Sequence, residues 1–342
     1  MTRNRRLAAF TNLFWALPLI LSAQNPDQTP GPAVMQAVAA AFPAGLRFSP
    51  APPSGEGSSV QPYHSCATVF SKRPDGTPDL VAAGYGGDGA EVAMLAYKPG
   101  AAQVIAAVTG QQLWLTDGDC QIAMMNLADP AQPASPLANV VDISFAGPDW
   151  FFVWDGKKLK NITALESEAY AARHDRPRSS TMYFAHVVDI DHSGPMQIAG
   201  SNTNADKFPQ GDGISSSGTL TLFRFNGTTY APAETLLLLQ EFEPQPPNWD
   251  ESMNGPWVDS DSIDMHHAPA PTCHLKIVNG DRNGSNRVNS AKVEINGVTV
   301  VLPTDVNPGV ETFTQTVQLQ KQNEIKVTVQ GPQKSHIYVT VR

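Results

Sequence analysis

From Cys66 onward, the chain consists of apolar runs of five to seven residues separated by Gly, Asp and Pro, and this spacing is the strongest constraint on its fold. Runs of this length and spacing are typical of all-β sandwiches, barrels and propellers. A longer helical period occurs in this region only at 164–174, and an Ala-rich segment at 33–42 also favours a helix. The sequence therefore predicts an all-β protein.

The composition excludes several classes of protein. Charged residues make up 16% of the 342 residues, which is too few for a coiled coil, and 41% are hydrophobic, which is too many for a disordered chain. The formal net charge of −9 argues against a nucleic-acid partner, because nucleic-acid binders are normally basic.

The first 23 residues have the pattern of a secretory signal peptide. Arg3, Arg5 and Arg6 precede an apolar run, and Leu21-Ser22-Ala23 places small residues before a cut between Ala23 and Gln24. An uncleaved anchor is the rival interpretation, but Pro18 interrupts the run. We expect a secreted, periplasmic or extracellular protein with no membrane span after cleavage.

Charge and composition divide the mature chain. Residues 24–271 carry net −15, whereas 272–342 hold eight basic and five acidic side chains, net +3. We expect a Pro- and Ala-rich leader at 24–62, a β-rich unit at 63–242, an acidic Pro-rich linker at 243–271 and a small β-sandwich at 272–342. Alternating apolar residues and Asn-Gly turn signals indicate the sandwich.

Three cysteines follow the proposed cut, at positions 66, 120 and 273. An exported chain can oxidise its thiols, so a Cys66–Cys120 disulfide is one expectation, with Cys273 left as a thiol. Three unpaired buried thiols are the alternative.

Segments 70–85 and 187–201 resemble the FG-GAP or VCBS-type repeat, whose pattern is D-x-D-x-D-G-x-x-D followed by a strand. In the second segment Gln197 replaces the last acid, and a shorter copy covers 142–150. The resemblance implies a degenerate or small β-propeller with an incomplete ring. The matching residues are Asp75, Gly76 and Asp79, then Asp142, Ser144, Gly147 and Asp149, then Asp189, Asp191, Ser193 and Gly194.

Residues 272–342 are similar to an immunoglobulin-like accessory module of secreted bacterial proteins, in which an NGD…RVSSA…LNG pattern recurs. The resemblance implies a β-sandwich without catalytic residues. The matching positions are Asn279, Gly280, Asp281, Arg287, Val288, Ser290, Ala291, Asn296 and Gly297.

One loop has the pattern of a weak calcium site. Asp189 and Asp191 alternate before Gly194, which permits a tight turn, and Ser193 and Gln197 would complete the ligands. Asp75 and Asp79 are the second choice. In the alternative interpretation the loop has lost its ion and the acids cap backbone amides. Calcium is the one cofactor that the sequence suggests.

Two further groups of residues have structural interpretations. An acidic and histidine-rich cluster has the residue types of a zinc or copper site, but we interpret it as a solvated linker because prolines divide it. The run DWFFVW at 149–154 lacks alternation and therefore predicts a strand buried on both faces. The cluster comprises Asp259, Asp261, Asp264, His266, His267, Cys273 and His274.

No nucleophile elbow, P-loop or dinucleotide-binding turn is present. We therefore expect a non-enzymatic binding or scaffold protein whose propeller loops meet an extracellular protein or a carbohydrate. An exported polysaccharide hydrolase or lyase on the same fold is the alternative, because paired carboxylates cannot be recognised from sequence spacing.

Overall fold

The structure is a computed structural model that describes residues 31–41, 64–70, 79–86, 91–98, 103–109, 120–145, 149–173, 175, 178, 180–202, 220–244, 257–266, 272–320 and 322–342. These residues form an all-β protein, as predicted, with the short helices α1 (Pro32–Ala41) and α2 (Glu168–Arg173) and a 3-10 turn at Pro136–Asn139. No helix in them has the length and apolarity that a membrane crossing requires. The predicted signal peptide and the side chains of Cys66 and Cys120 lie outside the described part.

The first three sheets are antiparallel and four-stranded, and in each the order of the strands follows the chain. Each strand pairs with the one that follows it in the chain, so that each sheet is an antiparallel β-meander. The first sheet contains β1 (His64–Phe70), β2 (Asp79–Gly86), β3 (Glu91–Lys98) and β4 (Gln103–Thr109). The second contains β5 (Cys120–Met125), β6 (Val140–Phe145), β7 (Asp149–Trp154) and β8 (Leu159–Asn161), and the third β9 (Met182–Val188), β10 (Gln197–Asn202), β11 (Leu220–Phe225) and β12 (Tyr230–Leu236).

The three sheets are stacked face to face, and strand β7 shows how. Its first five residues are all buried. Trp150 and Phe152 belong to a core shared with the first sheet, whereas Phe151 and Val153 belong to a core shared with the third. Because successive side chains of a strand point to opposite faces, a strand between two sheets needs apolar residues at every position. The prediction of a doubly buried strand at 149–154 is confirmed.

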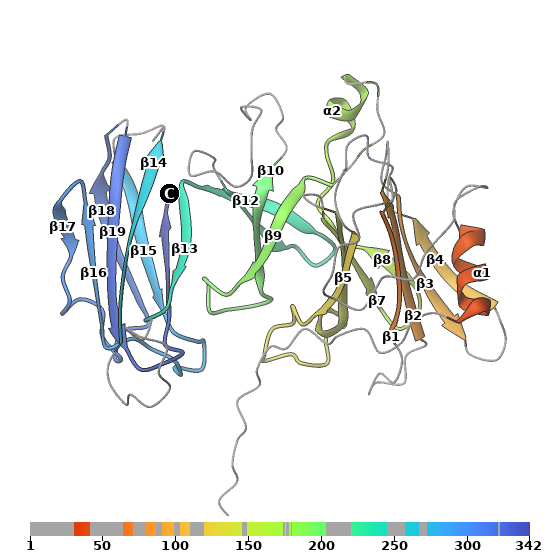
Figure 1. Cartoon of the computed structure of the whole chain (residues 1–342), viewed down its shortest axis with the longest axis horizontal. Coiled ribbons are helices and arrows are strands. Elements are labelled where there is room, and N and C mark those ends of the chain that lie inside the picture. The colour runs from red at the N-terminus through yellow and green to blue at the C-terminus, as the bar shows by residue number, and fades with distance from the viewer. Residues whose placement is uncertain are drawn as a thin grey trace, which may run out of the picture.

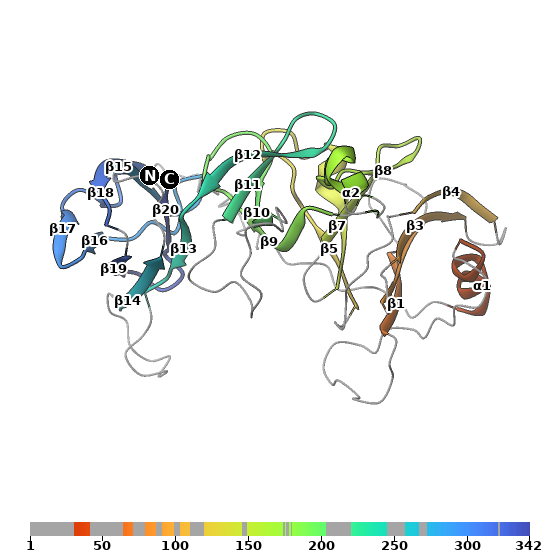
Figure 2. The same cartoon turned by 90° about the horizontal axis from the view of Figure 1, so that it is seen from above.

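Both ends of the stack are covered. At one end Val34 and Met35 of α1 pack on the outer face of the first sheet. At the other end, the third sheet shares an apolar cluster with Val278, Leu239 and Tyr338 of the C-terminal unit, which comprises residues 238–342. Figures 1 and 2 show the resulting row of helix, three sheets and C-terminal unit.

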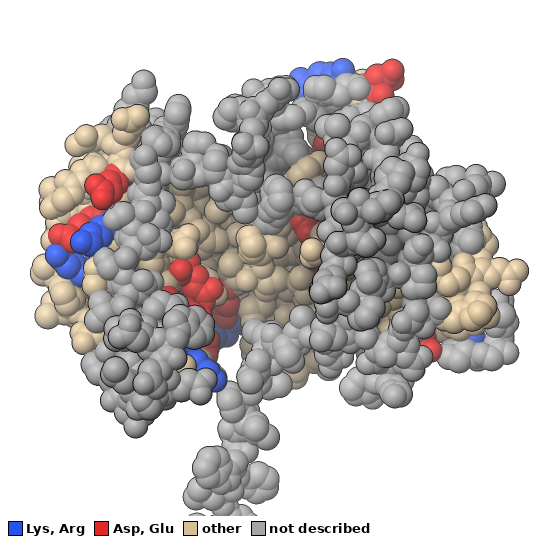
Figure 3. All heavy atoms as spheres, in the orientation of Figure 1, with Lys and Arg blue, Asp and Glu red and all other residues tan. Residues whose placement is uncertain are grey.

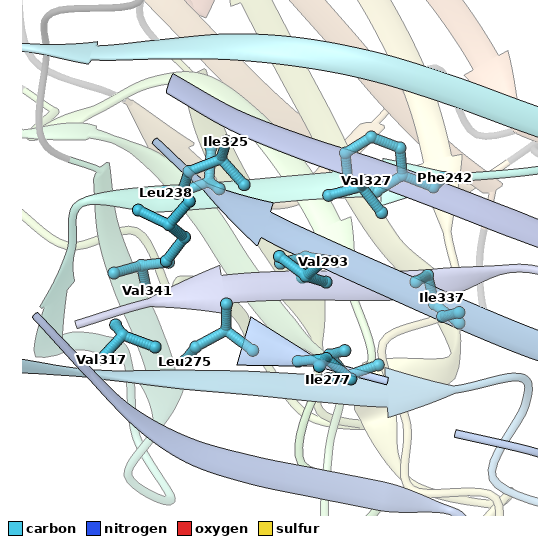
Figure 4. Packing of buried hydrophobic residues seen from close by; sticks show 14 of the residues in the cluster. Leu238, Phe242, Leu275, Ile277, Val293, Val317, Ile325, Val327, Ile337 and Val341 are labelled. Atoms are coloured by element: carbon cyan, nitrogen blue, oxygen red, sulfur yellow. The ribbon is translucent and has the colours of Figure 1, made fainter. Parts of the chain in front are cut away.

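The C-terminal unit consists of two four-stranded sheets with orders β13-β20-β15-β18 and β14-β19-β16-β17. Side chains from both sheets form a single core, part of which Figure 4 shows. The alternating burial along β15, β16 and β19 points one face of each strand into this core, which agrees with the alternation in the sequence. The strands are β13 (Leu238–Phe242), β14 (Trp257–His266), β15 (Thr272–Asn279), β16 (Ser290–Ile295), β17 (Val298–Val301), β18 (Thr312–Gln318), β19 (Gln322–Gly331) and β20 (Ile337–Val341).

The C-terminal unit begins upstream of residue 272, the boundary expected from the sequence. Strand β13 pairs with β20, and β14 pairs with β19 over ten residues. The stretch 243–271, interpreted from the sequence as a linker, therefore contains an edge strand. Only Leu237 separates β12 of the third sheet from β13, and its backbone N–H donates to the carbonyl oxygen of Val341 at 2.7 Å.

Gly280 has the backbone geometry that tolerates a side chain least. Its φ is +69°, and an added Cβ would lie 2.8 Å from the backbone nitrogen of Arg287 and still closer to the Ser285 carbonyl oxygen. Gly280→Ala should therefore lower the free energy of unfolding of the full chain by roughly 2–4 kcal/mol in a urea titration. Gly297→Ala is the matched control, because Gly297 has φ +78° but open space around it, and it should cost about 1–2 kcal/mol. Equal losses would contradict a steric role for Gly280.

Candidate functional site

The loop that the sequence singles out joins β9 to β10, where the third sheet meets the C-terminal unit. Its turn is made by His192 and Gly194, which both have positive φ. Gln197 accepts hydrogen bonds from the backbone N–H groups of Ile190 (2.9 Å) and Asp191 (3.2 Å), and its own amide donates to the Pro195 carbonyl at 2.9 Å. Gln197 therefore holds the loop in shape, while Ser193, the other neutral residue of the predicted ligand set, is exposed.

Asp189 is engaged by an arginine of the C-terminal unit. The Nε and Nη2 of Arg282 donate to the two carboxylate oxygens of Asp189 at 3.0 and 2.6 Å. Nη1 of the same guanidinium donates to the Gly194 carbonyl at 2.7 Å and to Asp129 at 3.2 Å. The side chains of Arg282, Asp189 and Asp129 are only 17–19% exposed, so solvent screens these ion pairs weakly.

Asp191 is engaged by a different guanidinium. Nε and Nη2 of Arg224 donate to its two carboxylate oxygens at 2.6 and 3.1 Å, and Nη2 also reaches Glu234 at 2.5 Å. Arg342, at the end of the chain, donates to the other oxygen of Glu234 at 2.6 Å. Burial by itself would raise the pKa of Asp191 and of Glu234, but the arginines outweigh it and hold both below their usual values.

Two more side chains join the loop to the C-terminal unit. The His192 ring, 3% exposed, lies between Glu311, 3.0 Å from Nδ1, and the Gly280 carbonyl, 3.1 Å from Nε2. Nζ of Lys276 donates to the Ile190 carbonyl at 2.7 Å, and burial lowers the pKa of this lysine. Figure 3 shows acidic and basic side chains side by side at this junction.

The structure brings Asp189 and Asp191 into one loop but gives them separate cationic partners. Within the described residues, no three His, Cys, Asp or Glu side chains are grouped as metal ligands. Of the second-choice pair, Asp79 begins β2 and Asp75 lies outside the described part.

The acidic and histidine-rich cluster is also divided. Four of its residues, Asp259, Asp261, Asp264 and His266, belong to strand β14, and their side chains are not described. His267 lies outside the described part. Cys273 is a thiol in the core of the C-terminal unit, whereas its neighbour His274 is exposed. Successive residues of β15 point to opposite faces, so these two cannot ligate one ion.

A buried pair of carboxyls, Asp142 and Asp149, matches the shorter repeat copy in the sequence but was not predicted to form a site. They lie diagonally on one face of the β6–β7 hairpin, since Asp149 pairs with Ser144 and Asp142 with Phe151. Burial raises the pKa of Asp149 to about 7, and burial together with the charge of Asp149 raises that of Asp142 well above its usual value. The Asp149 Oδ2 accepts the Ala185 N–H at 3.0 Å, and the Asp142 Oδ1 is buried without a hydrogen bond. The feature of the sequence that could have indicated this buried pair is an acidic residue within each of two apolar runs, VVDISF and DWFFVW.

Comparisons with known proteins add little. No family model matches the chain, and no curated protein matches it. Among solved structures, a GH31 alpha-xylosidase from Xanthomonas citri shares 8% identity over 81% of this chain, at a TM-score of 0.21, and the match spans 35% of the xylosidase. An exo-beta-1,3-galactanase from Phanerochaete chrysosporium shares 9% identity, with 80% of this chain and 82% of that chain covered, at a TM-score of 0.18. Similarities this low carry no argument about fold or function.

Proposed function

We propose that the chain is an exported, non-enzymatic binding or scaffold protein of the FG-GAP/VCBS repeat type. In this proposal the three stacked sheets are blades of a short, open β-propeller, and the C-terminal unit is an accessory β-sandwich. Consecutive four-stranded meanders packed face to face support the propeller interpretation, and a single core between two sheets supports the sandwich. An open ring is supported by α1 and the C-terminal unit, which cover the two end faces of the stack.

One observation carries this proposal: side chains of the best candidate loop join two parts of the molecule. Asp189 and His192 contact Arg282 and Gly280 of the C-terminal unit, while Asp191 pairs with Arg224 of the third sheet itself. Calcium, if it binds at this loop, competes with Arg282 for Asp189. Residues that hold a scaffold rigid suit a protein that presents its remaining loops to a partner, since preorganised loops lose less entropy on binding.

The proposed ligand is an extracellular protein or a glycan. Purified full-length chain should retain one of these in a panel of defined glycans and extracellular proteins, with the same affinity with and without EDTA, and should leave glycans at their original length. Chain shortening of a glycan, or the absence of retention in both arms, would contradict the proposal.

The buried carboxyl pair is the observation that favours the alternative, an exported polysaccharide hydrolase or lyase. A carboxyl whose pKa is about 7 suits a general acid. Asp142 and Asp149 are, however, only 7% and 5% exposed, which leaves little room for a sugar chain. If the alternative holds, the wild-type chain should shorten a polysaccharide and Asp149→Asn should abolish that activity without unfolding the protein.

A further inference from the structure

We propose that Asp129, Asp189 and the Gly194 carbonyl form a guanidinium-binding site on the stacked sheets, and that Arg282 of the C-terminal unit is its resident ligand. The site is specific for the planar guanidinium group. Emptied of Arg282, it should take a free guanidinium ion. The site shares the Asp189–Arg282 contact with the proposed function, but it stands whether or not the chain binds a protein or a glycan.

The geometry selects a guanidinium over other cations. All three nitrogens of the Arg282 fork donate to acceptors, at 2.6–3.2 Å, and none of the four contacts uses an acceptor of the C-terminal unit. Two of the contacts join Nε and Nη2 of Arg282 to the two carboxylate oxygens of Asp189. This is the bidentate arrangement that is typical of an arginine and a carboxylate. An ammonium group is compact and cannot reproduce this fork.

The acceptors are held in place by their own segments. Asp129 also accepts the backbone N–H of Ala131 at 2.9 Å, and Asp189 also accepts that of His192 at 3.2 Å. Gly194 sits in the turn that Gln197 supports from inside. These bonds do not involve Arg282, so the site should keep its shape when the arginine is removed.

The charges of Asp129 and Asp189 require a cation in this site. Without Arg282, the carboxylates of Asp129 and Asp189, which are both four-fifths buried, would lose the cation that they share at the junction of the third sheet and the C-terminal unit. Removing one partner of a buried ion pair is strongly destabilising, because the other charge stays desolvated. Arg282→Ala should therefore lower the melting temperature of the full chain by roughly 5–15 °C.

The test is chemical rescue. Guanidinium chloride at about 10 mM, far below denaturing levels, should raise the melting temperature of Arg282→Ala relative to the same concentration of NaCl, because a ligand that binds only the native state stabilises it. The wild-type chain should not respond. The matched control is the double variant Asp189→Asn, Arg282→Ala, which lacks the fork's main acceptor and should not respond either.

Arg282→Lys keeps the proposal testable if the alanine variant does not fold. It preserves the charge and removes the fork, so its melting temperature should fall between those of Arg282→Ala and wild type. The proposal is overturned if the lysine variant melts like wild type, if Arg282→Ala folds and guanidinium leaves its melting temperature unchanged, or if calcium stabilises that variant and guanidinium does not.

Discussion

A fragment that begins at residue 272 should fail to fold, whereas one that begins at residue 237 should fold cooperatively. The shorter fragment lacks β13 and β14, which pair with β20 along five residues and with β19 along ten. It also loses Leu238 and Phe242 from the core, and each such side chain contributes about 1.5–3 kcal/mol when buried. For a domain of this size that loss approaches the whole stability.

Thermal unfolding of the two fragments, followed by circular dichroism, measures this difference. We expect a sigmoidal transition for 237–342 and a gradual, non-cooperative change for 272–342. The 237–342 fragment with Phe242→Ala is the control for core packing. It should still melt cooperatively, at a lower temperature than the unsubstituted 237–342 fragment. A cooperative transition of the 272–342 fragment would show that β13 and β14 are dispensable.

The stability of the full chain should fall as the pH rises from about 4 to about 7. Asp142 and Asp149 have pKa values that are raised in the folded state, so the folded protein binds their protons more tightly than the unfolded chain does. Their favourable contribution is complete below the unfolded pKa near 4 and is lost as the pH passes through the folded value, about 7 for Asp149. For Asp149 alone the loss is on the order of 4 kcal/mol.

The matched variant for this prediction is Asp142→Asn, which removes the like charge and keeps the shape of the side chain. We expect it to be more stable than wild type at pH 8 and to show a weaker dependence on pH, as measured by urea unfolding at a series of pH values. If wild type and variant lose stability in parallel across this range, the carboxyl pair is not the cause.

Much of the fold could be predicted from local patterns. The alternation in KVEING and EIKVTVQG marks β16 and β19, and the turn between β16 and β17 carries Asn296 and Gly297 with positive φ, as an Asn-Gly hairpin requires. These features depend only on residues that are close together in the sequence, so they can be predicted without knowledge of the overall fold.

Strand β14 shows where local patterns fail. Its sequence, WVDSDSIDMH, contains three Asp residues, a type that is depleted in strands. The strand lies at the edge of its sheet, where acidic residues are tolerated because they discourage pairing with other chains. Its residues pair with residues of β19 that lie 56 to 74 positions later in the chain, from His266–Gln322 to Trp257–Gly331, so the pairing leaves no local signal.

The ion pairs of the candidate site could not be predicted from the sequence, for a similar reason. Asp189 and its partner Arg282 are 93 residues apart, and Asp129 is 153 residues from that arginine. The available signal was the charge difference between an acidic first unit and a basic C-terminal segment, which agrees with Arg282, Lys276 and Arg342 reaching acceptors of the third sheet. Charge totals indicate attraction between the two units and do not identify the side chains that meet.

Arginines hold the carboxylates of the 189–194 loop, Arg282 that of Asp189 and Arg224 that of Asp191, and we predict that they exclude a metal ion there. A calcium titration of the full chain followed by its melting temperature tests this claim most directly. We predict an unchanged melting temperature up to about 5 mM calcium, since any site there requires displacement of a bidentate guanidinium. A saturable rise in melting temperature that disappears in the Asp189→Ala, Asp191→Ala double variant would contradict the claim.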